Sequence, residues 1–442
     1  MPDNNDSKNS RRDFIKKSST LAGAAAFAGF ANASVTGHAA DNKTLKLGLI
    51  GCGGRGSGAA RQALLADDKV ELVAMADVFE KQLQNSLQTL QKTTVGERVK
   101  VKQDRQYLGL DAYEKMLASD IDIVILATPP AFRAPFIAAA IDAGKHVFAE
   151  KPGATDVAGA LSILESTKKA EEKGLFLVAG LQGRYEAQPR EMVKRLHGGD
   201  IGDLMAMRMT RYLGPVKVRQ RLEGMSELEY QIANWQYFTW LSGDGMVELF
   251  IHEIDRMAWI AGEYPVSCLA TGGRQTRIEE KHGHVFDHFA ACYKFASGLE
   301  LYASTRQQLG CDRTFEMVVN GSKGRCIGNG KVDFTITGDK AWASIDKSGS
   351  RRKRKASGQQ GHQLEHDAMY AALRSGGYIN NGDYLAKSTL MAIMARDSAY
   401  SGKEIIWDEM IKDPQRLVPT KLSWDMELPK WKVAMPGQHG II

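Results

Sequence analysis

One histidine and two carboxylates are spaced so that they could act together on a substrate. Residues 241–265, LSGDGMVELFIHEIDRMAWIAGEYP, have the apolar spacing of a helix and carry Glu248, His252 and Asp255. A spacing of four residues places Glu248 and His252 next to each other on one helix face. An imidazole whose pKa is near neutrality can take a proton from a hydroxyl group, and a neighbouring carboxylate can orient it. We therefore expect an acid–base site on this helix.

A second chemical motif is the glycine turn in LKLGLIGCGGRGSG, residues 45–58. An apolar strand runs into Gly51, Gly53 and Gly56 at the G-x-G-x-x-G spacing, and a helical pattern follows. The first glycine permits a tight turn, the second lets the backbone reach a pyrophosphate, and the third lets the helix pack on the strand. The turn predicts a dinucleotide site, and a glycine-rich loop of an unrelated α/β fold is the alternative.

A carboxylate in the right place strengthens the dinucleotide interpretation. The next strand, VELVAMAD, ends at Asp77, where a carboxylate can accept hydrogen bonds from both hydroxyls of an adenosine ribose. A 2′-phosphate would meet that negative charge, so NAD is favoured over NADP.

Two further strands end in residues able to face the same ligand. The apolar run 121–127 predicts a buried parallel strand that stops at Thr128 and Pro129, and a strand over HVFA leads into Glu150 and Lys151. Ligands of parallel sheets bind at this carboxyl edge. The predicted cofactor-binding residues are Gly51, Gly53, Gly54, Arg55, Gly56, Asp77, Thr128, Pro129, Glu150 and Lys151.

The glycine turn, Asp77, ATPP and GKHVFAEKP, at these spacings, resemble the glucose-fructose oxidoreductase, inositol dehydrogenase and rhizopine catabolism (Gfo/Idh/MocA) family over about residues 45–410. The resemblance implies that the EKP lysine, Lys151, points at the substrate beside the nicotinamide. It also implies that Glu248 and His252 complete the catalytic set with Lys151. The family usually has Asp where this chain has Glu248, which leaves the role of that side chain open.

The second half of the chain has a different hydrophobic pattern. Alternating segments such as HFAACYKFASGLELYASTRQQ predict an antiparallel sheet with one face free for oligomerisation into a dimer or tetramer. The expected fold class is α/β: an N-terminal Rossmann dinucleotide-binding domain and a C-terminal α+β domain with a large, mostly antiparallel open sheet. The predicted divisions are a signal peptide at 1–40, an NAD-binding domain at 41–165 and a substrate-binding and oligomerisation domain at 166–442.

Several polar and aromatic residues of the second half could stack on sugar rings or bind their hydroxyls. Core packing is the alternative for Trp235 and Trp240. The predicted substrate-binding residues are Arg184, Tyr185, Tyr212, Trp235, Tyr237, Asp255 and His366.

The N-terminal segment resembles a twin-arginine signal peptide. Residues 10–16 read SRRDFIK, a weakly apolar Ala/Gly-rich stretch follows, and small residues occur near Ala33 and Ala39. The resemblance implies export to the periplasm or beyond by the twin-arginine machinery, which carries proteins already folded and with their cofactor seated.

Other features limit the function classes. The formal charge of +6 gives little reason to expect a nucleic-acid partner, and no apolar run after the N-terminal segment predicts a membrane span. Five cysteines without a C-x-x-C pair argue against a disulfide framework or structural zinc. HQLEH at 362–366 matches an inverted zinc-protease pattern, but we expect no metal there, and we expect RRKRK at 351–355 in a solvated loop.

Together these features predict an exported NAD-dependent oxidoreductase that acts on the CH–OH group of a small carbohydrate or glycoside. Because free NAD is scarce outside the cytoplasm, the cofactor should stay tightly bound and be recycled in place, with hydride moving to and from a ring carbon, C3. One alternative is an NAD-dependent glycoside hydrolase that acts by transient oxidation, elimination, hydration and re-reduction. Another is a sugar-binding protein without catalysis.

Overall fold

The computed structural model describes residues 42–344, 351–428 and 432–438; the predicted signal peptide lies outside these ranges. The described residues belong to one compact unit, so the predicted division at residue 165 stays a prediction. Within the described part of the chain, no helix is both long and apolar enough to cross a bilayer.

The first layer is a parallel sheet of six strands in the order β3-β2-β1-β4-β5-β6. This order is the doubly wound arrangement in which ligands bind where the strand order reverses, between β1 and β4. All four residues of β4 are buried, as expected for a strand with helices on both faces. The strands are β1 Leu45–Ile50, β2 Val70–Asp77, β3 Gln106–Leu108, β4 Ile123–Leu126, β5 His146–Ala149 and β6 Leu177–Ala179. The helices of this layer are α2 Gly54–Ala66, α3 Glu80–Gln91, α4 Ala112–Leu117, α5 Arg133–Asp142 and α6 Val157–Glu172.

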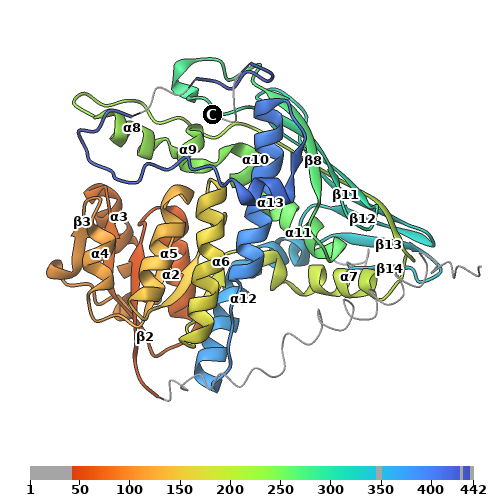
Figure 1. Ribbon diagram of the computed structural model, residues 1–442. Coiled ribbons are helices and arrows are strands. Elements are labelled where there is room, and N and C mark those ends of the chain that lie inside the picture. Colours follow the sequence, from red (N-terminus) through yellow and green to blue (C-terminus); the bar gives the residue numbers. More distant parts are fainter. Residues whose placement is uncertain (1–41, 345–350, 429–431, 439–442) are drawn as a thin grey trace, which may run out of the picture. The chain divides into compact units, whose positions relative to one another are not determined.

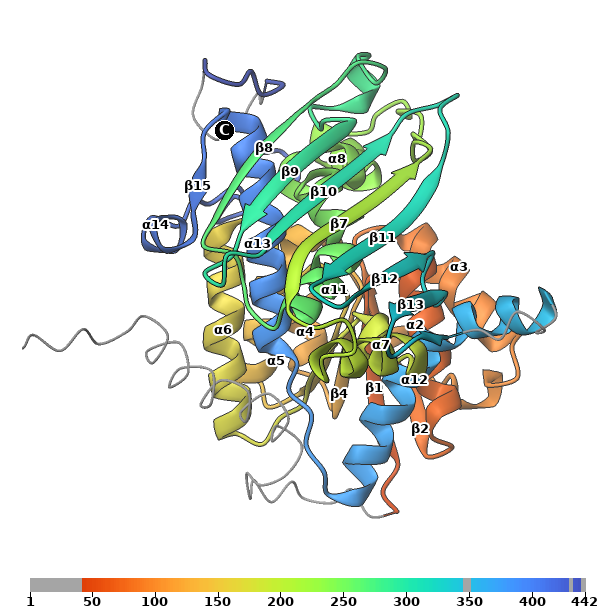
Figure 2. The same ribbon diagram turned by 90° about the vertical axis from the view of Figure 1, so that its right-hand side faces the viewer.

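The second sheet has nine strands in the order β14-β13-β12-β11-β7-β10-β9-β8-β15, and Figure 2 shows its central strands face on. All its paired strands are antiparallel except β7 and β10. The expected fold class is therefore confirmed. The strands are β7 Leu204–Leu213, β8 Ser267–Gly273, β9 His288–Lys294, β10 Glu300–Gln307, β11 Thr314–Gly321, β12 Gly324–Asn329, β13 Phe334–Gly338, β14 Trp342–Ala343 and β15 Ile405–Ile406.

Helices from the second half join the two sheets. The 20-residue helix α13 packs against α6 on one side and β8 on the other, which Figure 1 shows, and α12 packs on α2. Residues 351–355 begin α12, so the expectation of a loop there was wrong. These helices are α7 Ala187–His197, α8 Glu227–Ala233, α9 Thr239–Ser242, α10 Asp244–Glu248, α11 Ile251–Ala261, α12 Arg351–Ser375, α13 Gly382–Ser401 and α14 Trp407–Lys412.

Candidate active site

The glycine turn between β1 and α2 has the geometry of a pyrophosphate cradle. Gly51 has a φ of +92°, and a Cβ there would lie 2.7 Å from the carbonyl carbon of Ala127. A Cβ on Gly56 would lie 1.9 Å from the Gly51 carbonyl oxygen, so only glycine lets the helix approach the strand. Gly53 has open space where its side chain would be, at the N-terminus of α2. The backbone is therefore free to meet a phosphate at a helix end that favours negative charge.

Asp77 ends β2 at the same sheet edge. Its Oδ2 accepts a hydrogen bond from the Cys52 amide (2.7 Å), and its Oδ1 accepts one from the Phe79 amide (2.9 Å). These bonds fix the plane of the carboxylate while each oxygen keeps a lone pair for a further donor. Burial raises the pKa of Asp77, and the backbone donors oppose that rise. The carboxylate lines the main cavity and suits the two hydroxyls of a ribose.

Replacing Asp77 with alanine should weaken NAD binding by about 1–3 kcal/mol and reduce discrimination against NADP, because the ribose contacts are lost. Dissociation constants for both nucleotides, measured on nucleotide-free protein, test this. Asp68→Ala removes a fully exposed carboxylate close by in the sequence and should change neither constant. Unaltered selectivity in Asp77→Ala would leave Asp77 with no role in nucleotide binding.

Lys151, which follows β5, joins the two halves of the site. Its Nζ donates a hydrogen bond to the Glu248 carbonyl oxygen (2.7 Å) and forms an ion pair with Glu248 Oε1 (3.2 Å). The lysine and glutamate side chains are only 14% and 11% exposed. The ammonium group is therefore held in place by the end of α10, and its third hydrogen is available to a ligand.

His252 lies in the first turn of α11. The single helix predicted over this region is wrong, since α10 ends at Glu248 and α11 begins at Ile251. Glu248 and His252 nevertheless line the same cavity. Burial, followed by the charge of Lys151, lowers the pKa of His252 well below its usual 6.5. The imidazole is therefore neutral at physiological pH and able to accept a proton.

These groups surround one cavity of about 980 Å³. It runs along the carboxyl edge of the first sheet and reaches the helices of the second half, so it is large enough for a dinucleotide end and a sugar. The predicted residues that line it are Gly51, Gly53, Gly54, Arg55, Asp77, Thr128, Pro129, Glu150, Lys151, Trp235, Glu248 and His252. Gly56 lies beneath the turn and acts through packing.

The other predicted substrate residues are not among those that line this cavity. Arg184 and Asp255 form an ion pair (2.8 Å), and the guanidinium group stacks on the Tyr384 ring. His366 is buried and stacks on Phe148, with ring centroids 4.2 Å apart. The hydroxyls of the three tyrosines have protein partners: Tyr185 with Asn381, Tyr212 with Ser304, and Tyr237 with the Val216 carbonyl.

The residues of HQLEH do not form one metal-binding group in the structure: His366 stacks on Phe148, whereas His362 and Glu365 lie near Glu150. His362 Nδ1 lies 3.3 Å from Glu365 Oε1, and their ligand atoms lie within 4.8 Å of a Glu150 oxygen. Arg55 Nε lies 2.9 Å from Glu150, so a guanidinium group already balances charge there. Burial and the nearby Glu150 raise the pKa of Glu365 well above its usual value, while Arg55 opposes this. The cluster thus already contains a guanidinium group beside its carboxyl groups.

The sequence analysis did not identify a group of residues after position 412 that line one side of the cavity. Arg416, Val418, Lys421 and Leu422 line it. They belong to residues 413–428, here called the C-terminal segment, which lies beyond the stretch that carried the family resemblance. Its apolar residues Leu417, Val418, Leu422 and Trp424 were the only signal in the sequence that it packs on the protein.

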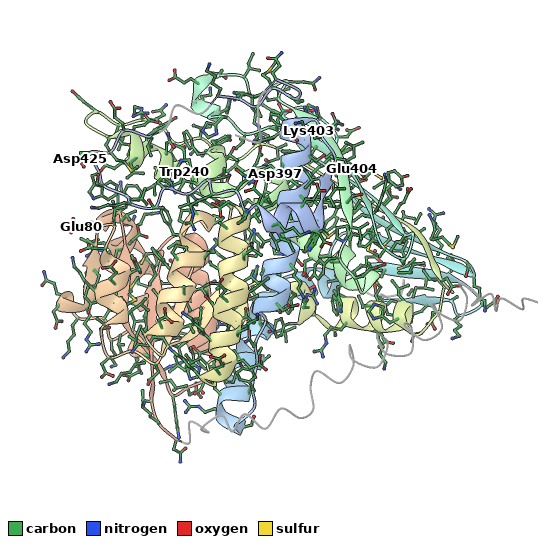
Figure 3. The ribbon with its side chains drawn as sticks, in the orientation of Figure 1. Glu80, Trp240, Asp397, Lys403, Glu404 and Asp425 are labelled. Carbon is green, nitrogen blue, oxygen red and sulfur yellow. The ribbon has the colours of Figure 1, made fainter. Side chains whose placement is uncertain are left out.

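The C-terminal segment is attached by polar and apolar contacts. The amides of Leu417 and Val418 donate hydrogen bonds to Asp156 Oδ2 (2.7 and 3.1 Å). Leu422 and Trp424 share a hydrophobic cluster with Phe79, which caps α3. In Figure 3, Asp425 of this segment lies above Glu80, the first residue of α3. The segment therefore covers the cavity near Asp77.

The fold and the site define a dinucleotide-dependent oxidoreductase. The profile of the oxidoreductase family with an NAD-binding Rossmann fold (GFO_IDH_MocA) matches residues 45–178, and that of the GFO/IDH/MocA C-terminal domain matches residues 190–327. Together they span more than half of the chain, which therefore belongs to the GFO/IDH/MocA family. The predictions of the family, of an NAD-dependent oxidoreductase and of NAD(H) as cofactor are confirmed.

Characterised relatives are distant. The chain is 25% identical to the myo-inositol 2-dehydrogenase of Thermotoga maritima over 296 residues, 66% of this chain and 77% of that protein. It is 26% identical to a glycosyl hydrolase family 109 protein of Shewanella pealeana over 280 residues, 63% of this chain and 54% of that protein, so it spans about half of that relative. The crystal structure of the aldose-aldose oxidoreductase from Caulobacter crescentus shares the fold, with a TM-score of 0.63, 18% identity, and coverage of 82% of this chain and 100% of that one.

Proposed function

We propose that this chain is an exported oxidoreductase that moves a hydride between a ring carbon of a sugar or glycoside, C3, and a tightly bound NAD that is recycled in place. The observation that carries the proposal is the convergence of Lys151, Glu248 and His252 in the cavity that also contains the glycine turn and Asp77. The relatives named as inositol dehydrogenases support a polyhydroxylated substrate.

His252, Lys151 and Glu248 each have a separate role in the reaction. His252 takes the proton from the reacting hydroxyl: its lowered pKa leaves the imidazole neutral with a free lone pair, although it is then a weaker base than a free imidazole. The Lys151 ammonium group donates a hydrogen bond to the same oxygen and stabilises the alkoxide charge that develops. Glu248 holds Lys151 in position through its carbonyl and carboxylate oxygens. NAD, held at the glycine turn and by Asp77, supplies the hydride acceptor.

Two features support export with a retained cofactor. The Ser-Arg-Arg-x-Phe-Ile-Lys string at 10–16 fits the twin-arginine pathway to the periplasm or the exterior. The C-terminal segment covers the cavity near Asp77, which favours slow nucleotide release. An enzyme that keeps its nucleotide needs no external pool, provided that a second sugar or keto-sugar returns the hydride.

We also propose that the chain forms a homodimer or homotetramer through the second sheet. Leu269, Cys292 and Tyr302 pair directly across β8, β9 and β10, so they share one face. Leu269 and Tyr302 are 51% and 50% exposed, which is unusual for such large apolar side chains at adjacent positions.

A glycoside hydrolase acting by transient oxidation is the second candidate. Two Shewanella relatives named as glycosyl hydrolase family 109 proteins favour it. In this scheme the same Lys151 and His252 act at the oxidised hydroxyl, and the substituent is lost by elimination before hydration and re-reduction.

Purified mature protein tests both schemes without added cofactor. Denaturation should release NAD in near equimolar amount, and protein that purifies empty would overturn the retained cofactor. Incubation with a panel of sugars and glycosides, followed by mass spectrometry, should yield 3-keto-sugars if the enzyme is an oxidoreductase. Release of the aglycone without net oxidation would identify the glycosidase, and binding with no product would contradict both.

A further inference from the structure

Lys331 is a cation at the catalytic end of the cavity to which the mechanism above assigns no role. It follows Gly330 in the turn between β12 and β13 and lines the main cavity. It also lines a smaller adjoining recess with His252, Gln182 and Glu186, and no residue of the glycine turn reaches that recess. Lys331 therefore lies with His252 where the main cavity and the recess meet.

Two of the neighbouring cations that line the same cavity, Lys151 and Arg211, have carboxylate partners. Lys151 is paired with Glu248 (3.2 Å), and Arg211 Nη1 contacts both oxygens of Glu253 at 2.9 and 2.8 Å. Among the residues whose side chains the structure describes, no carboxylate lies within ion-pair distance (4.0 Å) of Lys331 Nζ. Lys331 therefore carries a charge that has no direct ion-pair partner.

That charge lies in partly desolvated surroundings. Burial, followed by the charge of Arg211, lowers the pKa of Lys331; Glu253 and Glu186 oppose this, and Arg256 adds to it. A neutral sugar that filled the cavity would remove more water from the ammonium group and replace it only with neutral hydroxyl acceptors, which compensate the charge less well than an anion. An anionic group on the substrate would compensate the charge.

We propose that the substrate of this enzyme carries an acidic substituent, a carboxylate or a sulfate, which Lys331 binds at the catalytic end of the cavity. The proposal rests on the proposed function, since it assumes that a carbohydrate binds beside Lys151 and His252. Lys331 is then a specificity-determining residue: it selects the acidic sugar and leaves the proton and hydride chemistry to other groups.

Matched sugar pairs test the proposal on the NAD-containing protein. Methyl glucuronides and galacturonides are compared with the corresponding methyl glucosides and galactosides in both anomers, and a sulfated glucoside separates sulfate from carboxylate. Calorimetry gives the dissociation constants, and NADH absorbance gives the rate of reduction of the bound cofactor. At least one acidic sugar should bind about tenfold more tightly than its neutral partner.

Substitutions then assign the preference to Lys331. Lys331→Met should abolish it, and Lys331→Glu should reverse it. Lys323→Met, which removes an exposed lysine from the β11–β12 turn, at the other end of β12 and outside the cavity, should preserve it. Bound NAD content and thermal unfolding should match wild type in all three variants.

The outcomes separate the two proposals. If neutral sugars reduce the bound NAD and bind as tightly as acidic ones, or if the preference survives in Lys331→Met, the Lys331 proposal is wrong while the oxidoreductase stands. If acidic sugars bind through Lys331 but none is oxidised or cleaved, the proposed function fails and the anion site stands. If no acidic sugar binds more tightly than its neutral partner, the anion site is overturned.

Discussion

Replacing Lys151 with methionine should slow reduction of NAD by sugar roughly 10²–10⁴-fold while the protein keeps its fold and its NAD. Methionine preserves the length and apolar stem of the side chain but removes the charge that stabilises the alkoxide. Glu248 Oε1 would lose its ion-pair partner (3.2 Å in wild type), so the variant should also show a small loss of thermal stability.

Single-turnover reduction of NAD, followed by NADH absorbance at saturating sugar, measures the effect on hydride transfer. Lys92→Met, at an exposed lysine that follows α3, is the matched control and should reduce NAD at the wild-type rate. A wild-type rate in Lys151→Met would remove Lys151 from the mechanism.

His252→Ala should cause a loss of similar size, roughly 10²–10⁴-fold, because the proton acceptor beside Lys151 and Glu248 is removed. We also expect a particular pH dependence of the wild-type rate of NAD reduction. Only the unprotonated imidazole accepts a proton, and its pKa is lowered well below 6.5. The rate should therefore stay constant as the pH falls through 6.5 and decline only well below that value.

Single-turnover rates between about pH 5 and 8 test this profile. His197→Ala, at the end of α7 and outside the cavity lining, is the control and should leave both rate and profile unchanged. A rate that falls with a midpoint near 6.5 would show that the reacting base is not a buried histidine of lowered pKa.

The nucleotide half could be predicted from sequence because its determinants are local. Gly51, Gly53 and Asp77 lie at the ends of strands whose order follows from the alternation of strands and helices. Gly51 has a steric reason to be glycine, Gly53 leaves open space for a ligand, and Asp77 is fixed by hydrogen bonds. Lys151 could be predicted as a site residue because it directly follows a buried strand and because it matches the family motif.

The substrate half was less predictable because its pairings are long-range. Arg184 and Asp255 suggested ligand contacts by residue type, yet they are 71 residues apart in sequence and neutralise each other. The break between α10 and α11 has no helix-breaking residue, since Leu249 and Phe250 both fit a helical pattern. Lys331 lacks a local signal altogether, because its position depends on where the β12–β13 turn meets α11.

The C-terminal segment has a consequence for the timing of nucleotide exchange. Residues 416–422 lie more than 300 positions after Asp77 in the sequence, yet they line the same cavity. We expect nucleotide release to require this segment to detach. The dissociation rate would then depend on the hydrogen bonds to Asp156 and on the packing of Leu422 and Trp424. Retention of the nucleotide is then a kinetic property as well as one of affinity.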